Sequence, residues 1–205
     1  MIRQVSPVAK VSRFILALTG ASGAIYGIRA LQLLARMPDM ETHLILSPAA
    51  ARTIAEETDW TVGRLKDLAT VVHSHRDIGA TIASGSFKTL GMLIAPCSIR
   101  TLSNVVTCNS DNLIARAADV VLKERRRLVL MLRETPLHLG HIELMAGATR
   151  MGAIVMPPVP GFYARPKTLD DIIDQSVGRA LDLFDMDLDV VKRWKGTADV
   201  EEKAE

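Results

Sequence analysis

The segment FILALTGASGAIYG, residues 14–27, joins an apolar run to a glycine-rich turn and then to a second apolar run. Residues 14–18 are continuously apolar, which is typical of a β-strand that is covered on both faces. Beyond Gly23, polar side chains recur at helical spacing, so the segment predicts a strand, a turn and a helix. Backbone N–H groups at such a helix start point toward the turn, and they are suited to binding a phosphate.

The turn alone leaves two interpretations open. Gly20 and Gly23 do not follow the GxGxxG spacing of dinucleotide-binding folds or the GxxxxGK[ST] spacing of nucleoside triphosphatases. The alternative to phosphate binding is a tight strand-to-helix turn in which Ser22 is the helix N-cap, because serine and glycine are both common at such positions.

Strand-like and helical patterns alternate along the rest of the chain. Further strand-like runs occupy residues 42–46, 92–95, 128–132 and 153–156, with a weaker one near 71–72. Helical patterns occupy residues 49–57, 112–126, 138–151 and 168–184. This alternation predicts an α/β fold in three layers, with a mainly parallel sheet between helices.

Charge and length exclude several classes of protein. The 205 residues include 25 Lys and Arg against 23 Asp and Glu, so no global basic field argues for a nucleic-acid partner. No run approaches the roughly 18 apolar residues of a membrane span, and residues 1–12 lack the apolar core of a signal peptide. We therefore expect a cytoplasmic protein with one domain over residues 13–194 and terminal tails at 1–12 and 195–205.

The apolar residues are mostly aliphatic, since hydrophobic residues make up 48% of the chain and aromatic residues only 4%. Part of such a surface is expected to be buried between subunits, so the composition favours a homo-oligomer. The two cysteines, Cys97 and Cys108, form no zinc or disulfide pattern and are consistent with a reducing compartment.

Ligands of open parallel sheets bind at the carboxyl ends of the strands, near the point where the strand order reverses. The segments expected there read TGASG, SPAAA, IASGSF, PCSIRTLSN, RETPLH and PPVPGFYARP. All of them carry small, hydroxyl, charged or proline residues, at which a phosphate, a flavin or a sugar can be bound. Together they are a stronger signal than the first turn alone.

Six motifs in this order resemble the UbiX-type flavin prenyltransferases over about residues 13–194: TGASGAIYG, ASGS, PCSIRTL, RAADVVLKERR, LRETPLHLGH and PPVPGFYARP. The resemblance implies a Rossmann-like or flavodoxin-like fold and the transfer of a dimethylallyl group from dimethylallyl monophosphate to reduced FMN. The product, prenylated FMN, is the cofactor of UbiD-type decarboxylases. The resemblance also implies a dodecamer in which neighbouring subunits line the prenyl site.

The resemblance assigns a role to each matching residue. FMN would contact Gly20, Ala21, Ser22, Ser47, Ser98, Ile99, Arg100, Thr101 and Arg133. The prenyl phosphate would contact Arg116, Lys123, Tyr163 and Arg179. Glu134 would handle protons, and the catalytic set would also include Ser22, Arg116 and Lys123.

No metal is expected in this reaction. Departure of the donor's phosphate leaves an anion and a cation-like prenyl fragment, and guanidinium and ammonium groups can hold that anion in place of magnesium. Residues 170–174 read DDIID, which matches the DDxxD pattern of some metal sites, but we interpret Asp170 and Asp171 at a predicted helix start as charges that the helix dipole favours. His138 and His141 do not assemble a convincing set of metal ligands with Glu143.

Each assignment has a structural alternative. Arg116, Asp119 and Lys123 share one helical face and could be a solvated charged stripe. Arg179 has the same alternative, Glu134 could form a surface ion pair, Ser47 could only cap a helix, and Tyr163 could only close its proline-rich loop.

Two other functions compete with prenyl transfer. An FMN-dependent cysteine decarboxylase would resemble this chain in fold, but its PASANT segment and PxMNxxMW loop are absent. A noncatalytic FMN carrier would not need the second phosphate site that Arg116, Lys123 and Arg179 suggest.

The sequence leaves open whether Arg100 contacts flavin phosphate or a subunit, and what Ile78 does where some relatives have tryptophan. It also leaves open the oligomer size, the decarboxylase supplied and the use of dimethylallyl diphosphate.

Overall fold

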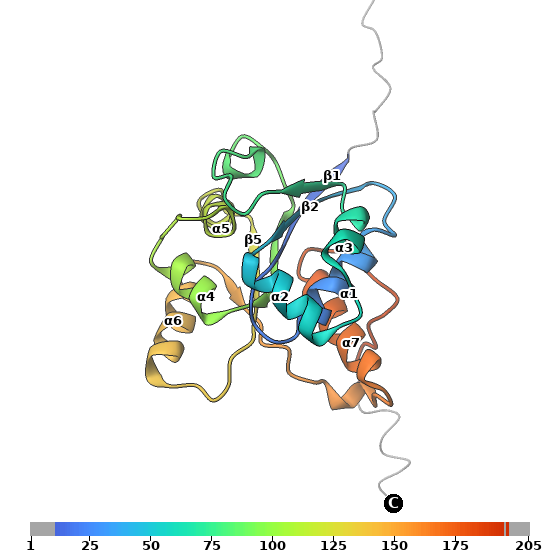
Figure 1. The fold of residues 1–205 in the computed structure, drawn as a ribbon. Helices are drawn as coiled ribbons and strands as arrows, with labels where there is room; N and C mark the ends of the chain where they lie inside the picture. The colour runs from blue at the N-terminus through green and yellow to red at the C-terminus, as the bar shows by residue number, and fades with distance from the viewer. Residues whose placement is uncertain (1–10, 195, 197–205) are drawn as a thin grey trace, which may run out of the picture.

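A parallel sheet of six strands lies at the centre of the structure, a computed structural model that describes residues 11–194 and 196 (Figure 1). The strands are β1 (Ser12–Leu18), β2 (Met40–Leu46), β3 (Val71–His73), β4 (Gly91–Cys97), β5 (Arg127–Leu132) and β6 (Ile154–Val155). Their order in the sheet is β3-β2-β1-β4-β5-β6, and every pairing is parallel. The predicted α/β class and parallel sheet are confirmed.

Helices cover both faces of the sheet (Figure 1). On one face lie α1 (Ala24–Leu34), α2 (Pro48–Glu57), α3 (Val62–Leu68) and α7 (Leu169–Asp182). On the other lie α4 (Ile99–Val106), α5 (Leu113–Lys123) and α6 (Leu139–Arg150). Short 3-10 helices, η1 (Thr81–Ala83) and η2 (Phe162–Ala164), interrupt the connections.

The apolar run of β1 explains the three layers. Phe14, Leu16 and Leu18 pack into the core beside α1 and α7, whereas Ile15 and Ala17 pack into the core beside α4 and α5. Successive side chains of a strand point to opposite faces, so a strand covered on both sides must be apolar throughout.

Gly27 lets α1 lie directly on the sheet. A Cβ atom at this position would stand 2.1 Å from the Ala95 carbonyl oxygen and 2.5 Å from Cγ of Leu18. Only a residue without a side chain permits this approach between helix and strands.

Several boundaries differ from the sequence-based predictions. The segment after β4, expected as a loop, becomes helical at Ile99 because the Ser98 hydroxyl accepts a hydrogen bond from Thr101 N–H at 3.3 Å. Helix α3 was not predicted, and β6 is shorter than the expected strand at 153–156. Most of the predicted tails lie outside the described residues, and Ser12 already belongs to β1. Within the described part of the chain, no helix combines the length and apolarity needed to cross a membrane.

A chain of polar contacts links the first three strands. Arg13 Nε donates to Glu41 Oε1 at 3.0 Å, and His43 Nε2 lies 2.8 Å from the same oxygen. Nδ1 of His43 lies 2.9 Å from Nε2 of His73. Burial lowers the pKa of both histidines, and the hydrogen bond from His43 lowers the pKa of Glu41. The histidines are therefore neutral and the carboxylate ionised at pH 7.

We expect the stability of the fold to decrease as the pH falls below about 6.5, the ordinary pKa of histidine. The unfolded chain binds protons there, while the folded histidines stay neutral to lower pH, so stability is complete above that pH and is lost below it. Urea unfolding between pH 7.5 and 5.5 should show a flatter pH dependence for His43→Gln than for the parent. An unchanged slope in His43→Gln would contradict the expectation.

Candidate functional site

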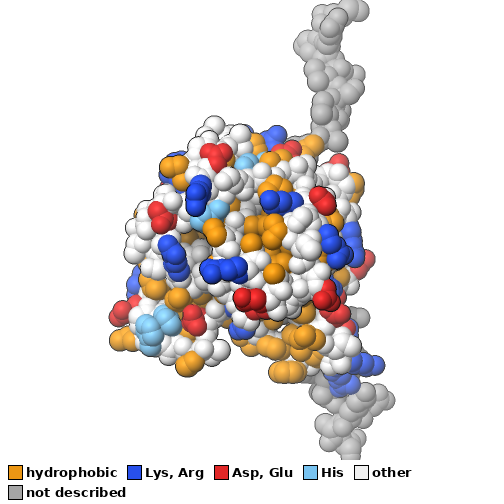
Figure 2. All heavy atoms as spheres, in the orientation of Figure 1, with side chains coloured by type: hydrophobic (Ala, Val, Ile, Leu, Met, Phe, Trp, Pro, Cys, Tyr) orange, Lys and Arg blue, Asp and Glu red, His pale blue; other side chains and the backbone are white. Residues whose placement is uncertain are grey.

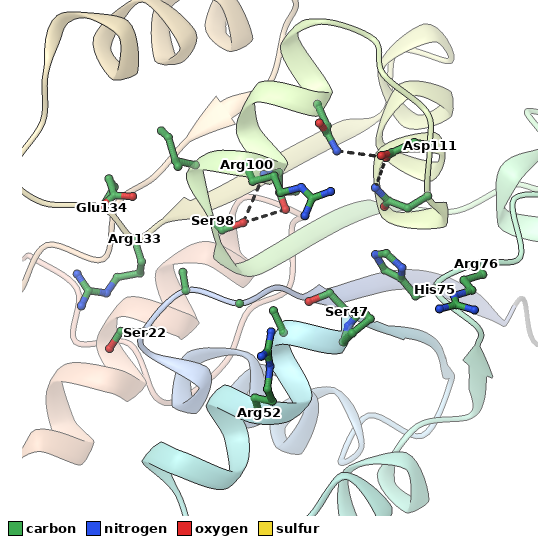
Figure 3. Close-up of a pocket in the computed structure, with 18 of the residues that line it drawn as sticks. Ser22, Ser47, Arg52, His75, Arg76, Ser98, Arg100, Asp111, Arg133 and Glu134 are labelled. Atoms are coloured by element: carbon green, nitrogen blue, oxygen red, sulfur yellow. Dashed lines mark hydrogen bonds between the residues drawn. The ribbon is translucent and has the colours of Figure 1, made fainter.

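The strand order reverses at β1, which lies between β2 and β4, and the loops beyond the carboxyl ends of these strands surround a cavity (Figure 3). Its volume is about 880 Å³, and loops after β1, β2, β3, β4 and β5 line it. A switch point of this kind is the usual ligand site of an open parallel sheet.

Thr19 connects two of these loops. Its hydroxyl donates to the Pro96 carbonyl oxygen at 2.7 Å and accepts from the Ser98 N–H at 2.8 Å. The backbone N–H of Thr19 also donates to the Pro96 carbonyl oxygen, at 3.2 Å. Only 2% of Thr19 is exposed, so these hydrogen bonds form away from solvent and fix the turn after β1 against the start of α4.

The start of α1 neither has Ser22 as its N-cap nor leaves its first N–H groups free for a phosphate. Gly23, with φ of 98°, is the N-cap residue, so the interpretation of Ser22 as the cap is wrong. The N–H groups of Gly23 and Ala24 donate to Oε2 of Glu57 at 2.8 and 3.0 Å. These two N–H groups, which were predicted to suit a phosphate, therefore already bind a carboxylate.

Glu57 also belongs to the environment of the cavity. Burial raises the pKa of its carboxyl, but the hydrogen bonds from Gly23, Ala24 and Ser22 and the charge of Arg133 lower the pKa overall. The Glu57 carboxylate is thus ionised, and it interacts with Ser22 and Arg133, two residues that were predicted to contact FMN.

Ser47 and Ser98 begin helices that start at the cavity. The Ser47 hydroxyl accepts from Ala50 N–H at 3.0 Å and the Ser47 N–H donates to the Leu18 carbonyl oxygen at 3.0 Å, which ties α2 to β1. Ser98 caps α4 in the same way. Both serines are therefore caps and cavity residues, so the two interpretations of Ser47 do not exclude each other.

The residues after β5 close one end of the cavity. The Arg133 N–H donates to the Cys97 carbonyl oxygen at 3.0 Å, and the Glu134 carboxylate accepts from Thr135 N–H at 3.3 Å. Nε of Arg133 is buried and has no hydrogen-bond partner among the described residues. Ser22 lies at the same end (Figure 3). A buried donor without a partner beside a cavity is consistent with a missing ligand.

The structure gathers ten of the predicted site residues around this one cavity: Gly20, Ala21, Ser22, Ser47, Ser98, Ile99, Arg100, Thr101, Arg133 and Glu134. They come from loops that are far apart in the sequence. The residues that the resemblance assigns to FMN and the residue that it assigns to proton handling, Glu134, therefore lie around the same cavity.

The four residues predicted to contact the prenyl phosphate do not line the cavity of their own chain. On α5, Arg116 pairs with Asp119 at 2.9 Å and Lys123 pairs with Glu124 at 2.6 Å. Elsewhere, Arg179 pairs with Asp182 at 2.6 Å, and the Tyr163 hydroxyl accepts from Gln175 Nε2 at 3.1 Å.

Lys123 lies beside the ASGS motif. A Cβ atom at Gly85 would stand 2.8 Å from Lys123 Nζ. Two carbonyl oxygens of the same loop, those of Gly85 and Phe87, accept hydrogen bonds of 2.7 Å from the Arg126 guanidinium. Two motifs of the resemblance therefore meet on the α5 side of the molecule.

Several cavity residues were missed by sequence reasoning, among them Arg52, His75, Arg76, Asn104, Asp111 and Asn112. Arg52 lies on the second turn of α2, where a helical charge usually indicates only a solvated face. The segment after β3 reaches the cavity because Leu113 N–H at the start of α5 donates to the His75 carbonyl oxygen at 2.9 Å. No sequence signal marks that contact.

No group of three or more His, Cys, Asp or Glu side chains in the described part of the chain is arranged to hold a metal ion. The rings of His138 and His141 lie against each other, with centroids 3.6 Å apart. Asp171 forms a capping box with Thr168 at the start of α7.

The chain is similar to known proteins over most of its length. The Flavoprotein family model matches residues 3–181. Flavin prenyltransferase UbiX of Thauera aromatica is 60% identical over 189 residues, which are 92% of this chain and 97% of the relative.

Two solved structures are similar to the whole fold. AnUbiX in complex with FMN and dimethylallyl pyrophosphate matches with a TM-score of 0.87 and 48% identity, over 90% of this chain and 98% of that one. A dodecameric FMN-dependent UbiX-like decarboxylase from Escherichia coli O157:H7 matches with a TM-score of 0.88 and 46% identity, over 90% of this chain and 100% of that one.

We expect Thr19→Val to lower the free energy of unfolding by about 1–3 kcal/mol, because it leaves the Ser98 N–H without its partner. It should also weaken FMN binding, because the turn after β1 is no longer fixed against α4. Urea unfolding and FMN titration measure the two effects. Thr19→Ser keeps the hydroxyl and should stay near the parent, and parental stability and affinity in Thr19→Val would contradict this role.

Proposed function

This chain belongs to the UbiX family of flavin prenyltransferases, and we propose that it transfers a dimethylallyl group from dimethylallyl monophosphate to reduced FMN. One observation carries the assignment of the site: the residues that the family resemblance gives to FMN and to proton handling line a single cavity. The complex of AnUbiX with FMN and dimethylallyl pyrophosphate supports both ligand classes. The product would serve a UbiD-type decarboxylase.

The cavity fits FMN in size and in chemistry. A volume of about 880 Å³ is within the roughly 300–1,000 Å³ of small-molecule sites. The starts of α2 and α4 and the unpaired Nε of Arg133 offer hydrogen-bond donors to phosphate, hydroxyl and ring oxygens. When bound and reduced, FMN supplies the electron-rich nucleophile of the reaction.

Arg116, Lys123, Tyr163 and Arg179 would bind the phosphate of the prenyl donor. Guanidinium and ammonium groups favour departure of phosphate by holding its charge, and a hydroxyl can donate to it. The ion pairs of Arg116 with Asp119 and of Lys123 with Glu124 do not oppose this role, because pairs between partly exposed side chains contribute little. Arg179 is itself 44% exposed, although its partner Asp182 is largely buried.

We infer that neighbouring copies of the chain bring these four residues to the cavity. The dodecameric relative supports an assembly of this kind. Large apolar side chains also remain exposed, including Leu139 on α6 at 69% and Phe162 on η2 at 73%, and Figure 2 shows hydrophobic side chains gathered along the lower edge of the molecule. Apolar surface of this kind is typical of a subunit contact.

Glu134 would hold and move the proton of the reaction. It lies beside Arg133 at the end of the cavity, half-buried, with a carboxylate oxygen free for a further contact beyond the hydrogen bond from Thr135. A proton must leave the flavin when the new ring closes, and phosphate departs more easily when protonated, so one carboxyl group can serve either step.

We expect the protein, incubated without oxygen with reduced FMN and dimethylallyl monophosphate, to raise the mass of the flavin by one prenyl substituent. Glu134→Gln should bind both ligands but form the product about 10²- to 10⁴-fold more slowly, as is typical of the loss of a general acid or base. Time-resolved mass spectrometry of the flavin measures both results. Replacing the donor with dimethylallyl diphosphate tests its use as a second substrate.

The outcomes separate the possibilities. Unchanged FMN in the parental protein, with both ligands shown to bind, would contradict prenyl transfer and leave the carrier function. If the protein instead oxidises and decarboxylates a cysteine-containing peptide, the result would indicate the FMN-dependent cysteine decarboxylase function. Parental rates in Glu134→Gln would contradict only its proton role, and Glu56→Gln, which changes an exposed carboxylate outside the cavity, serves as the matched control.

Subunit complementation should test the shared site. Glu134 and Arg116 would act in one site from different chains, so coexpressed Glu134→Gln and Arg116→Ala chains should form mixed oligomers in which some sites are complete. Activity above the sum of the separate variants is expected. Arg133→Ala mixed with Glu134→Gln should give no recovery, because both residues line the cavity of the same chain. A monomer in light scattering, or no recovery in the first mixture, would contradict the shared site.

A further inference from the structure

Asp182 is a buried carboxylate at the end of α7. Its side chain is only 8% exposed, and it is the last residue of the helix, where the helix dipole disfavours a negative charge. A carboxylate that is buried and lies at the negative end of a helix is costly unless cations contact it directly. The groups around Asp182 therefore show what this charge is held by and what it holds.

Two arginines from different segments bind this carboxylate. Arg179, one turn earlier on α7, donates from Nη1 to Asp182 Oδ2 at 2.6 Å. Arg193, beyond the end of the helix, donates from Nη1 to Oδ2 at 3.0 Å and from Nη2 to Oδ1 at 3.1 Å. A guanidinium that contacts both oxygens in this way fixes the plane of the carboxylate. Asp182 is therefore held by Arg193 and in turn holds Arg179.

The segment that carries Arg193 is itself fixed to α7. The buried side chain of Gln175 donates to the Lys192 carbonyl oxygen at 3.1 Å and accepts from the Lys192 N–H at 2.9 Å. One turn further along the helix, a Cβ atom at Gly178 would stand 2.4 Å from Cγ2 of Val191, so the segment packs closely on the helix there. Arg193 thus follows a stretch of backbone that α7 holds in place.

The guanidinium of Arg179 is fixed along one side and open along another. Its side chain is 44% exposed, and among the described residues only Asp182 accepts a hydrogen bond from it, so Nε and Nη2 can still donate to a ligand. A guanidinium is a rigid planar fork, so an acceptor on one nitrogen also sets the direction of the others. An arginine already held in this way loses less rotamer freedom when it binds an anion.

We propose that Asp182, held by Arg193, is a positioning residue that fixes Arg179 in the orientation that binds the phosphate of the prenyl donor. The inference rests on the proposed function, which assigns that phosphate to Arg179. Asp182 does not touch the donor and acts only through the guanidinium.

The charge of Asp182 has an effect of the opposite sign. A carboxylate 2.6 Å from the guanidinium reduces the positive charge that is offered to a phosphate. If charge were the larger effect, removal of the carboxylate would strengthen donor binding. Positioning predicts that the same change weakens it, so the direction of the change decides between them.

The test measures the dissociation constant of dimethylallyl monophosphate by calorimetry, on protein loaded with oxidised FMN so that no transfer occurs, and then KM and kcat with reduced FMN. Asp182→Ala should weaken donor binding and raise KM by about 10-fold, and leave kcat and FMN affinity within about 2-fold. Asp182→Asn keeps one acceptor oxygen in the same shape and should weaken the donor by only about 3-fold. Arg193→Gln should also weaken it.

Asp174→Ala is the matched control. It removes a carboxylate from the same helix that pairs with Arg29, an arginine with no assigned role in donor binding. Donor affinity should stay parental in this variant. A loss equal to that of Asp182→Ala would show a general effect of disturbing α7 and would overturn the proposal.

A double-mutant cycle separates positioning from loss of structure. In an Arg179→Ala background, itself weaker for the donor, Asp182→Ala should add no more than about 2-fold, because the group through which it acts is gone. A full additional loss, or donor affinity at or above that of the parent in both Asp182 variants, would overturn the proposal. Retained FMN affinity shows that a variant is folded, and Asp182→Asn carries the test if Asp182→Ala does not fold.

Failure of the proposed function gives a different result. A parent that forms no prenylated FMN, or parental donor affinity in Arg179→Ala, would contradict the role given to Arg179 and would remove the basis of this inference with it. Weak donor binding in Arg179→Ala together with parental binding in Asp182→Ala would contradict the positioning role alone.

Discussion

The buried Thr19 hydroxyl joins two of the loops that form the site. It donates to Pro96 and accepts from Ser98, so one side chain at the end of β1 fixes both loops of the switch point. The central strands would still pair without it, because their ladders are formed by backbone groups. The Ser98 N–H at the start of α4 would lose its partner, although the Thr19 N–H would still donate to the Pro96 carbonyl oxygen. Architecture and site geometry therefore have different physical origins in this molecule.

The architecture was largely predictable because it follows from hydrophobic pattern. The run at residues 14–18 had to be a strand with two covered faces, and the alternation along the chain required helices on both sides. Helix α4 was missed because its start, at Ser98, looks like a loop in sequence and becomes a cap only when Thr101 N–H reaches the hydroxyl. The first turn was misjudged for a similar reason, since the carboxylate at the start of α1 comes from Glu57, at the far end of α2.

The candidate site was predictable only in part. Motifs identify residues, and ten of them met at one cavity, but motifs do not say which chain of an assembly supplies each residue. Arg116 and Lys123 match the family as well as Arg133 does, yet they do not line the cavity of their own chain. Arg52 and Arg76 belong to no motif, and only the packing of the segment after β3 against α5 places Arg76 at the cavity. Contacts between distant segments, which carry no local signal, account for most of what the sequence could not predict.

The carboxylate of Glu57 at the start of α1 has a consequence for the direction in which a ligand can lie. A helix start of this kind attracts anions in many α/β proteins, but here it already holds a negative charge and would repel a second one. The start of α1 is thus occupied by a carboxylate, whereas α2 and α4, which start at the same cavity, have no acidic residue in their first turns. An elongated ligand with a single charged terminus has one favourable orientation, and a neutral residue at position 57 would make the two orientations more nearly equal. Glu57 therefore changes the electrostatics of the cavity although it does not line it.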